Sequence, residues 1–202
     1  MANKPQLIVI AGPNGAGKST LAEHFILRKI IIINPDVIAK EYSLSPLEAG
    51  KIAIRQRKEM LVRRKSFAIE TTLTGNGEIG LMEEAKKIGY KVNLAYIGID
   101  DVSLSRTRVK IRVAKGGHNV PNEDITRRYK RSINNLAKAF GIADRAYILD
   151  NSAVKRDLLY IKNDRIEKQI KSNLPKWAEK SIREIKELNK NDRKARDFGC
   201  GL

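Results

Sequence analysis

The chain has 202 residues, 42% of them hydrophobic, and its formal net charge is +17. This hydrophobic content excludes global disorder, and the length suits one α/β domain or one domain with a small appendage. No apolar run is long enough to span a membrane, the start Met1–Pro5 leaves no room for a signal peptide, and the single cysteine, Cys200, excludes an internal disulfide framework. We therefore expect a cytoplasmic protein without a membrane partner, whose positive field attracts anions such as nucleotides, nucleic acid or an acidic protein.

The first motif is a phosphate-binding loop (P-loop) of the pattern G-x-x-x-x-G-K-[ST]. It is the stretch Gly12-Pro13-Asn14-Gly15-Ala16-Gly17-Lys18-Ser19-Thr20. An apolar run at 7–11, typical of a buried strand, precedes it, and residues 21–27 with helical spacing follow it. In such a strand–turn–helix unit, the backbone N–H groups of the turn and the helix dipole converge on phosphate oxygens. Lys18 is expected to reach the β- and γ-phosphates of ATP and Ser19 to hold Mg²⁺.

Short apolar strands then alternate with helices along the chain. The expected strands are 7–11, 30–33, 67–69, 91–99 and 146–150, and the expected helices are 21–27, 45–65, 78–88, 102–115 and 122–140. Ser45, followed by proline, is typical of a helix start; Asp101 and Asn122 are candidate caps, and Gly89 is placed to end a helix. Residues 34–36 are typical of a turn that ends the second strand. The alternation predicts right-handed βαβ crossovers and a parallel sheet.

The pattern changes after residue 150. Residues 158–161 and 166–170 are typical of a β-hairpin, and a charged helix begins near Pro175. We therefore predict a single three-layer α/β domain over residues 1–202 with a mainly parallel five-stranded sheet. Its core covers 1–152 and includes a lid around 102–131, and residues 153–202 add the hairpin and the charged helix at the edge or an end of the sheet.

Other motifs narrow the use of the P-loop, which alone does not specify a reaction. Transporter ATPases carry a signature resembling L-S-G-G-Q and GTPases carry Asn-Lys-x-Asp, and neither occurs here. The chain is also short for most motor ATPases. A kinase for a small molecule or a polymer remains, so the expected fold is of the P-loop kinase type. Such an enzyme needs a phosphate cradle, a metal, a base near the acceptor and mobile cations.

Acidic side chains follow three strands whose carboxyl ends are expected to meet beside the loop. We interpret Asp36 as the base that takes the proton of the acceptor, with a helix-capping or turn aspartate as the alternative. Glu70 interrupts an otherwise apolar strand end, which favours a ligand contact over a structural hydrogen bond to a nearby turn. Asp100 and Asp101 are explained by helix capping.

Two basic helices joined by Gly116-Gly117 suit a lid that closes over ATP and excludes water. Arginine offers a planar fork for phosphate oxygens, and only about two such cations can reach one phosphate. The candidates are Arg106, Arg108, Lys110, Arg112 and Lys115 before the glycines and Arg127, Arg128, Lys130 and Arg131 after them.

Together these residues resemble the zeta toxin family of P-loop kinases, in its shorter chromosomal form. The resemblance runs from Ile8 to about Ser152 and rests on several blocks in the right order. The blocks are IAGPNGAGKST, NPD at 34–36, FAIETTLTG at 67–75, GYKVNLAYIGI, RVAKGGHNVP at 112–121 and ADRAYILDNS. The resemblance implies ATP-dependent phosphorylation of a hydroxyl group, with UDP-N-acetylglucosamine as the acceptor of the better-known members and an antitoxin protein as partner.

The resemblance also implies residue roles. Lys18 and Ser19 match the loop residues of the family, and Asp36 matches its base. Glu70 and Thr72 look like its acceptor-binding pair.

The lid arginines of the family look like Arg112 and Arg128. A small shift of the alignment would put Arg108 or Arg127 in either place. The chain is shorter than the toxins of the family, which leaves the identity of the acceptor open between a sugar nucleotide and another small anionic molecule.

A nucleic-acid-binding ATPase or an RNA-end kinase is the alternative, motivated by the net charge of +17, the basic lid and the charged tail. Only 5% of the residues are aromatic, and basic residues do not interleave with them as in a base-stacking platform. Nucleic acid is therefore a possible partner that the sequence does not favour. A steep loss of affinity for single-stranded RNA with rising salt would distinguish this alternative.

Overall fold

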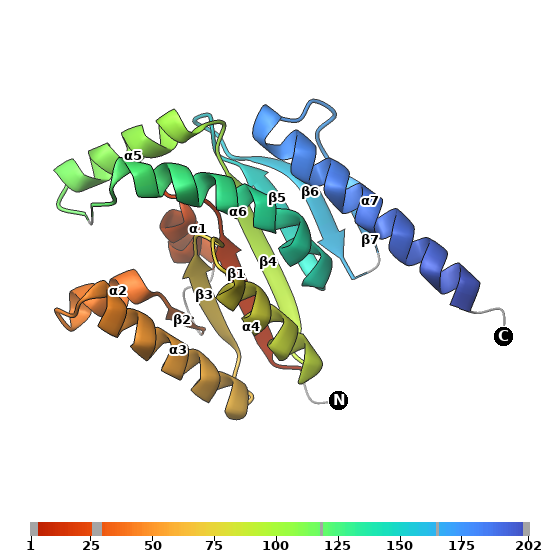
Figure 1. The fold of residues 1–202 in the computed structure, drawn as a ribbon, viewed down its shortest axis with the longest axis horizontal. Coiled ribbons are helices and arrows are strands. Elements are labelled where there is room, and N and C mark those ends of the chain that lie inside the picture. Colours follow the sequence, from red (N-terminus) through yellow and green to blue (C-terminus); the bar gives the residue numbers. More distant parts are fainter. Residues whose placement is uncertain (1–3, 26–29, 118, 165, 200–202) are drawn as a thin grey trace.

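The computed structural model describes residues 4–25, 30–117, 119–164 and 166–199 (Figure 1). Cys200 lies outside these ranges. In chain order the elements are β1 (Gln6–Ala11), α1 (Lys18–Phe25), β2 (Ile31–Ile33), α2 (Pro35–Glu41), α3 (Pro46–Val62), β3 (Phe67–Thr71), α4 (Asn76–Lys87), β4 (Lys91–Gly98), α5 (Val102–Ala114), α6 (Asn122–Ile142), β5 (Arg145–Asp150), β6 (Asp157–Asn163), β7 (Ile166–Gln169) and α7 (Lys176–Gly199). None of the helices within the described ranges has the length and apolar character needed to cross a membrane.

The strands form one sheet in the order β2-β3-β1-β4-β5-β6-β7. β1 to β5 are parallel, as βαβ units require, whereas β6 runs antiparallel to β5 and β7 antiparallel to β6. The prediction of five strands is therefore wrong, because the predicted hairpin supplies the last two strands of a seven-stranded sheet. Its pairing, for example Ile148 with Tyr160, gives hydrogen-bond partners to an edge of β5 that would otherwise lack them.

Most of the predicted helix starts have the expected local cause. Ser45 and Glu48 form a reciprocal capping box at the start of α3. Asp101 accepts hydrogen bonds from two backbone N–H groups in the first turn of α5. The expected cap at Asn122 is wrong: α6 begins at this residue, Pro121 occupies the cap position, and no side chain caps the helix there.

The helix α2 differs from the sequence prediction, which places a turn at residues 34–36. Asn34 is its N-cap and accepts a hydrogen bond from the backbone N–H of Asp36 at 2.9 Å. Pro35 has no N–H group to donate and suits the first helical position. The Asn-Pro pair therefore ends β2 and starts α2 without an intervening loop.

Helices cover both faces of the sheet, which gives the three layers that the sequence predicts. Alternate residues of β1 point to opposite faces. Leu7 and Val9 pack into the larger core cluster with buried residues of α3, α4, α6 and α7. Ile8 and Ile10 pack into a smaller cluster with Leu21 of α1. Because β1 to β5 are parallel, their carboxyl ends lie together, and the segments that follow these strands all leave the sheet at that end.

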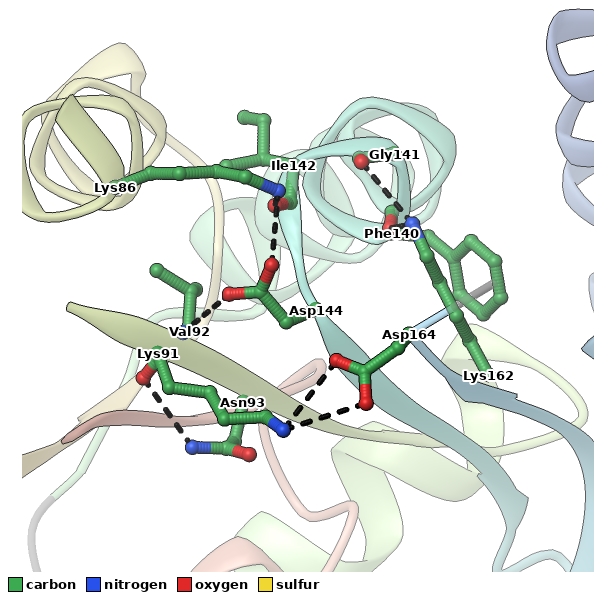
Figure 2. Close-up of polar contacts among 10 residues, drawn as sticks. All are labelled: Lys86, Lys91, Val92, Asn93, Phe140, Gly141, Ile142, Asp144, Lys162 and Asp164. Atoms are coloured by element: carbon green, nitrogen blue, oxygen red, sulfur yellow. Dashed lines mark hydrogen bonds and ion pairs between the residues drawn. The ribbon is translucent and has the colours of Figure 1, made fainter. Parts of the chain in front are cut away.

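The carboxyl end of α6 is held at the opposite end of the sheet, where the parallel strands begin (Figure 2). Lys86 Nζ donates to the carbonyl of Ile142 at 2.6 Å. Lys162 Nζ lies 3.2 and 3.1 Å from the carbonyl oxygens of Phe140 and Gly141. The two ammonium groups bind carbonyls that have no partner inside the helix, and their charge favours the negative end of its dipole. They fix this end of α6 against α4 and β6.

Helix α7 is held against the sheet by Trp177, which is almost fully buried. The centroid of its ring lies 5.9 Å from that of Tyr96. The indole covers Gly98 so closely that a Cβ atom at this position would overlap it. Its Nε1–H group donates to Asp150 Oδ1 at 2.9 Å. One side chain of α7 therefore contacts the carboxyl ends of both β4 and β5.

We expect Gly98→Ala to lower the free energy of unfolding by about 1–3 kcal/mol, because the added methyl group overpacks against Trp177. Gly80→Ala is the control. Gly80 lies inside α4 with nothing within 4 Å of an added Cβ atom. It should raise the free energy of unfolding by roughly 0.5–1 kcal/mol, because alanine loses less backbone entropy than glycine. Urea unfolding followed by circular dichroism measures both effects, and equal stability of the two variants would contradict the close contact of α7 with β4.

Candidate active site

The predicted P-loop, residues 12–20, connects β1 to α1 and turns at its glycines. The φ angles of Gly12, Gly15 and Gly17 are 142°, 72° and 86°, in the region that glycine adopts without steric cost. Gly12 also lies against the backbone of Ile97 in β4, where a side chain has no room. The loop then enters the first turn of α1, whose positive dipole end faces the same space.

The carbonyl groups of four consecutive P-loop residues each accept a hydrogen bond from a side chain. The pairs are Lys18 Nζ to Pro13 O (3.0 Å), Ser105 Oγ to Asn14 O, Arg108 Nη1 to Gly15 O (3.5 Å) and Asn151 Nδ2 to Ala16 O (2.9 Å). The donors come from α1, from α5 and from the segment after β5. Inside the loop the backbone N–H of Ala16 also donates to Pro13 O at 3.3 Å. The N–H groups of Gly15 and Gly17, which follow two of the bound carbonyls, are suited to an anion.

Lys18 lies over the loop with only 8% of its surface exposed. Burial lowers the pKa of its ammonium group to about 8, and the positive charges of Arg112 and Arg128 act in the same direction. The carboxylates of Glu70 and Asp36 act in the opposite direction. These four groups therefore lie within electrostatic reach of the lysine at the centre of the site.

Glu70 connects the P-loop to α2 through its two carboxylate oxygens. Ser19 Oγ donates to Glu70 Oε1 at 2.8 Å, and Asn34 Nδ2 donates to Glu70 Oε2 at 2.9 Å. The other amide atom of Asn34, Oδ1, accepts from the backbone N–H of Asp36, whose side chain is exposed. Asn34 thus binds the carboxylate of Glu70 with one amide atom and the backbone of Asp36 with the other.

The pair Ser19 and Glu70 fits a magnesium ion chemically. A hydroxyl group that donates its proton to a carboxylate keeps its oxygen lone pairs for a cation. Mg²⁺ prefers oxygen ligands and is usually bound through one or two carboxylates together with substrate phosphates. Ser19 was predicted for this role from the motif, and the structure adds Glu70 beside it.

The predicted acceptor residue Thr72 lies in the short loop after β3. Its hydroxyl oxygen is 3.2 Å from that of Thr74. Between them Leu73 has a φ angle of 56° although its side chain is fully buried. Asn135 of α6 donates to the carbonyl of Leu73 at 2.9 Å, which links this loop to α6. Positive φ at a buried leucine is a strained conformation of the kind that is found at functional sites.

The structure separates the four candidate lid arginines by their contacts. Arg127 Nη2 pairs with Asp124 at 2.7 Å, and Arg128 Nη2 lies 4.0 Å from the other oxygen of the same carboxylate. Arg108 binds carbonyl oxygens of the P-loop and of Asn151. Arg112 and Arg128 are instead the two arginines whose charges act on Lys18. Arg112 and Arg128 therefore lie within electrostatic reach of the P-loop lysine.

The sequence analysis did not predict several residues that shape the site. Asn34, Ser105 and Asn151 are not part of the P-loop pattern, yet each binds the loop, Glu70 or the helix of Asp36. Asn34 and Asn151 fall inside the sequence blocks NPD and ADRAYILDNS. The short Asn-Pro helix start is the one local signal that could have identified Asn34.

Comparison with known proteins connects this site to a family. The zeta toxin family model matches residues 1–165. An uncharacterized protein of Haemophilus influenzae is 37% identical over 134 residues, which cover 64% of this chain and 94% of that protein.

Two solved structures share the fold. A chain of the AvrRxo1-ORF1:-ORF2 complex with ATP has a TM-score of 0.72 and 15% identity, and the match covers 91% of this chain and 64% of that one. A structure from the PezAT chromosomal toxin–antitoxin system of Streptococcus pneumoniae has a TM-score of 0.57 and 23% identity, and the match covers 77% of this chain and 72% of that one. At these identities the likeness shows the fold alone. The extensive match to the family model shows that this chain belongs to the zeta toxin family, and its fold is that of the P-loop kinases.

Proposed function

We propose that this protein is a Mg²⁺-dependent kinase that transfers the γ-phosphoryl group of ATP to a hydroxyl group of a sugar nucleotide such as UDP-N-acetylglucosamine. Family and fold support an ATP-dependent phosphotransferase. The observation that carries the proposal is Glu70, which binds Ser19 of the P-loop and Asn34 beside Asp36. It joins a donor half of the site to a half suited to an acceptor.

In the donor half, the N–H groups of the P-loop bind the β-phosphate. Lys18 neutralises the oxygens between the β- and γ-phosphates, and Arg112 and Arg128 bind the γ-phosphoryl group as its charge redistributes. Ser19 and Glu70 would hold Mg²⁺, which when bound supplies further positive charge beside these phosphates.

In the acceptor half, Asp36 takes the proton of the attacking hydroxyl group. The new bond forms between that oxygen and the γ-phosphorus, the bond to the oxygen shared with the β-phosphate breaks, and ADP leaves. Thr72 and the neighbouring Glu70 orient the acceptor, and closure of the segment 102–131 excludes water. Orientation and charge stabilisation supply most of the catalysis in phosphoryl transfer.

The acceptor and the partner rest on the family and on charge. A net charge of +17 favours an anionic acceptor over a neutral sugar. The PezAT structure comes from a toxin–antitoxin system, and we propose by analogy an antitoxin partner and an action in the cytoplasm for this chain.

Asp36→Asn should reduce phosphoryl transfer by about 10²–10⁴-fold, because the amide cannot accept the proton of the acceptor. Binding of ATP should stay within about twofold, since the P-loop is unchanged. Glu41→Gln, at the exposed far end of the same helix, is the matched control and should transfer at the parent rate. Transfer from labelled ATP and calorimetric titration with ATP measure the two quantities. Transfer by Asp36→Asn at the parent rate would show that another group is the base.

A panel of acceptors tests the substrate class. The purified protein is incubated with labelled ATP and Mg²⁺ and with sugar nucleotides, nucleosides or RNA with free 5′-hydroxyl ends. We expect labelled product from a sugar nucleotide. Product from RNA ends alone would establish the RNA-end kinase instead, and slow hydrolysis of ATP without any product would refute the kinase.

The lowered pKa of Lys18 predicts an alkaline limit for the use of ATP. The value of kcat/KM for ATP reports the free enzyme, in which Lys18 loses its proton near pH 8 rather than near the ordinary lysine value of about 10.4. It should therefore fall above about pH 8, because the neutral amine no longer offsets phosphate charge. The Lys18→Arg variant keeps its positive charge at these pH values. We expect it to be less active than the parent protein, but its kcat/KM should not fall above about pH 8. A parent profile that stays flat to about pH 10 would exclude Lys18 as the titrating group.

A further inference from the structure

Residues 72–75, here named the acceptor loop, connect β3 to α4 and carry the hydroxyl groups of Thr72 and Thr74. The two oxygens lie 3.2 Å apart, so the hydroxyls form one hydrogen-bonded pair. Both threonines are half-buried and follow closely on Glu70. In the proposed kinase, on which this inference rests, this loop orients the acceptor.

Leu73 stands between the two threonines in a backbone conformation that leucine rarely adopts. Its φ angle is 56°, in the left-handed region, while its side chain is fully buried in the larger core cluster. A strained residue keeps such a conformation only where its surroundings fix it. If Leu73 relaxed to a negative φ, the chain would change direction between Thr72 and Thr74, and their hydroxyls would no longer meet.

Side chains bind both polar backbone groups of Leu73. Its N–H donates to Thr71 Oγ1 at 3.0 Å, within the same stretch of chain. Its carbonyl accepts from Asn135 Nδ2 at 2.9 Å, and Asn135 belongs to α6, 62 residues further along the chain. Because Leu73 is buried, each of these groups needs a partner. Asn135 therefore fixes the acceptor loop from outside the β3–α4 segment.

Asn135 lies on the face of α6 that also carries Arg128. Positions 128, 132 and 135 are four and three residues apart, which places them on one face of the helix. The charge of Arg128 reaches Lys18, and Ser132 Oγ lies 3.0 Å from the buried hydroxyl of Tyr96 in β4. Arg128 and Asn135 are separated by roughly 10 Å along the helix axis. One helix thus contributes an arginine near the P-loop lysine and, two turns later, holds the acceptor loop.

We propose that Asn135 is a positioning residue for the acceptor. Its hydrogen bond keeps Leu73 in the left-handed conformation, which holds the hydroxyl groups of Thr72 and Thr74 where the acceptor binds. Asn135 acts through Leu73 rather than by contact with the acceptor. An amide suits this task because it donates to a buried carbonyl without bringing a charge beside the core. Phosphoryl transfer depends strongly on the orientation of the acceptor, so loss of this contact should be felt there and not in the binding of ATP.

The test removes the donor with Asn135→Ala. Asn134→Ala is the matched control, because it makes the same change at the exposed neighbouring residue of α6. Asn135→Gln keeps an amide donor on a side chain that is one methylene longer. The full chain is used throughout.

Amide hydrogen exchange reports on the acceptor loop without any ligand. We expect exchange at residues 72–75 to be about tenfold faster in Asn135→Ala, the range of one hydrogen bond, and unchanged in Asn134→Ala. Mass spectrometry of peptides that cover this loop measures the rates. Exchange at the parent rate in Asn135→Ala would refute the hold on Leu73.

Initial rates of transfer from labelled ATP report on the acceptor. The acceptor is UDP-N-acetylglucosamine, or the member of the acceptor panel that gives product. We expect Asn135→Ala to raise the KM for the acceptor about tenfold and to leave the KM for ATP within about twofold. Asn135→Gln should lie between the parent and Asn135→Ala. A purely structural role would reduce the amount of folded enzyme, which lowers the apparent kcat and leaves both KM values unchanged.

The remaining outcomes separate this inference from the proposed function. Transfer by the parent together with an unchanged acceptor KM in Asn135→Ala refutes the inference alone. Equal rises of both KM values refute a role confined to the acceptor, and equal losses in Asn135→Gln and Asn135→Ala refute the amide donor as the cause. A parent that forms no product with any acceptor refutes the proposed kinase and, with it, the role of Asn135 in positioning.

Discussion

The site depends on the hydrogen bonds that hold the four carbonyl groups of residues 13–16. In a trans peptide, the carbonyl of one residue and the N–H of the next point in opposite directions. Ser105 and Asn151 bind the carbonyls of Asn14 and Ala16 from the outer side, which turns the N–H groups of Gly15 and Gly17 toward the phosphate side. The N–H of Ala16, in contrast, donates to Pro13 O at 3.3 Å. Ser105, Arg108 and Asn151 come from distant parts of the chain. The shape of the loop therefore depends on how α5 and the segment after β5 pack beside it.

A second connection runs from the loop toward the acceptor side. Ser19, Glu70 and Asn34 form a chain of side-chain hydrogen bonds that ends at the first turn of α2, which carries Asp36. Hydrogen bonds to a carboxylate are stronger than those between neutral groups, so they hold the side chains of Ser19 and Asn34 in fixed orientations around Glu70. The two ends of α6 differ: the carboxyl end is bound by Lys86 and Lys162, whereas no side chain caps the helix at its start.

Much of this arrangement could be predicted from local patterns. The P-loop, the parallel strands and the caps Ser45 and Asp101 each depend on residues close in sequence, and each is found as expected. The seven-stranded sheet and α2 were missed, because a hairpin pattern does not reveal which strand it will join and Asn-Pro suits a turn as well as a helix start.

Local sequence patterns do not predict the side-chain contacts that distinguish the roles of individual residues in the site. The donors to Asn14 and Ala16 are 91 and 135 residues away along the chain, and neighbouring arginines on one helix look alike in a sequence. Only the folded sheet separates Arg108, which binds the P-loop backbone, from Arg112, whose charge reaches Lys18. Contacts between residues so far apart along the chain produce no periodic pattern in the sequence from which they could be predicted.

The long separation between the P-loop and Asn151 has a consequence for biosynthesis. A chain leaves the ribosome with its N-terminus first, and the complete motif of residues 12–20 emerges early. Asn151, which binds Ala16, and Trp177, which binds Asp150, emerge only after most of the protein has been made. An interrupted nascent chain therefore carries the full nucleotide-binding motif without the outer donors that shape it. The set of side chains that bind the P-loop is therefore complete only after synthesis has passed Asn151.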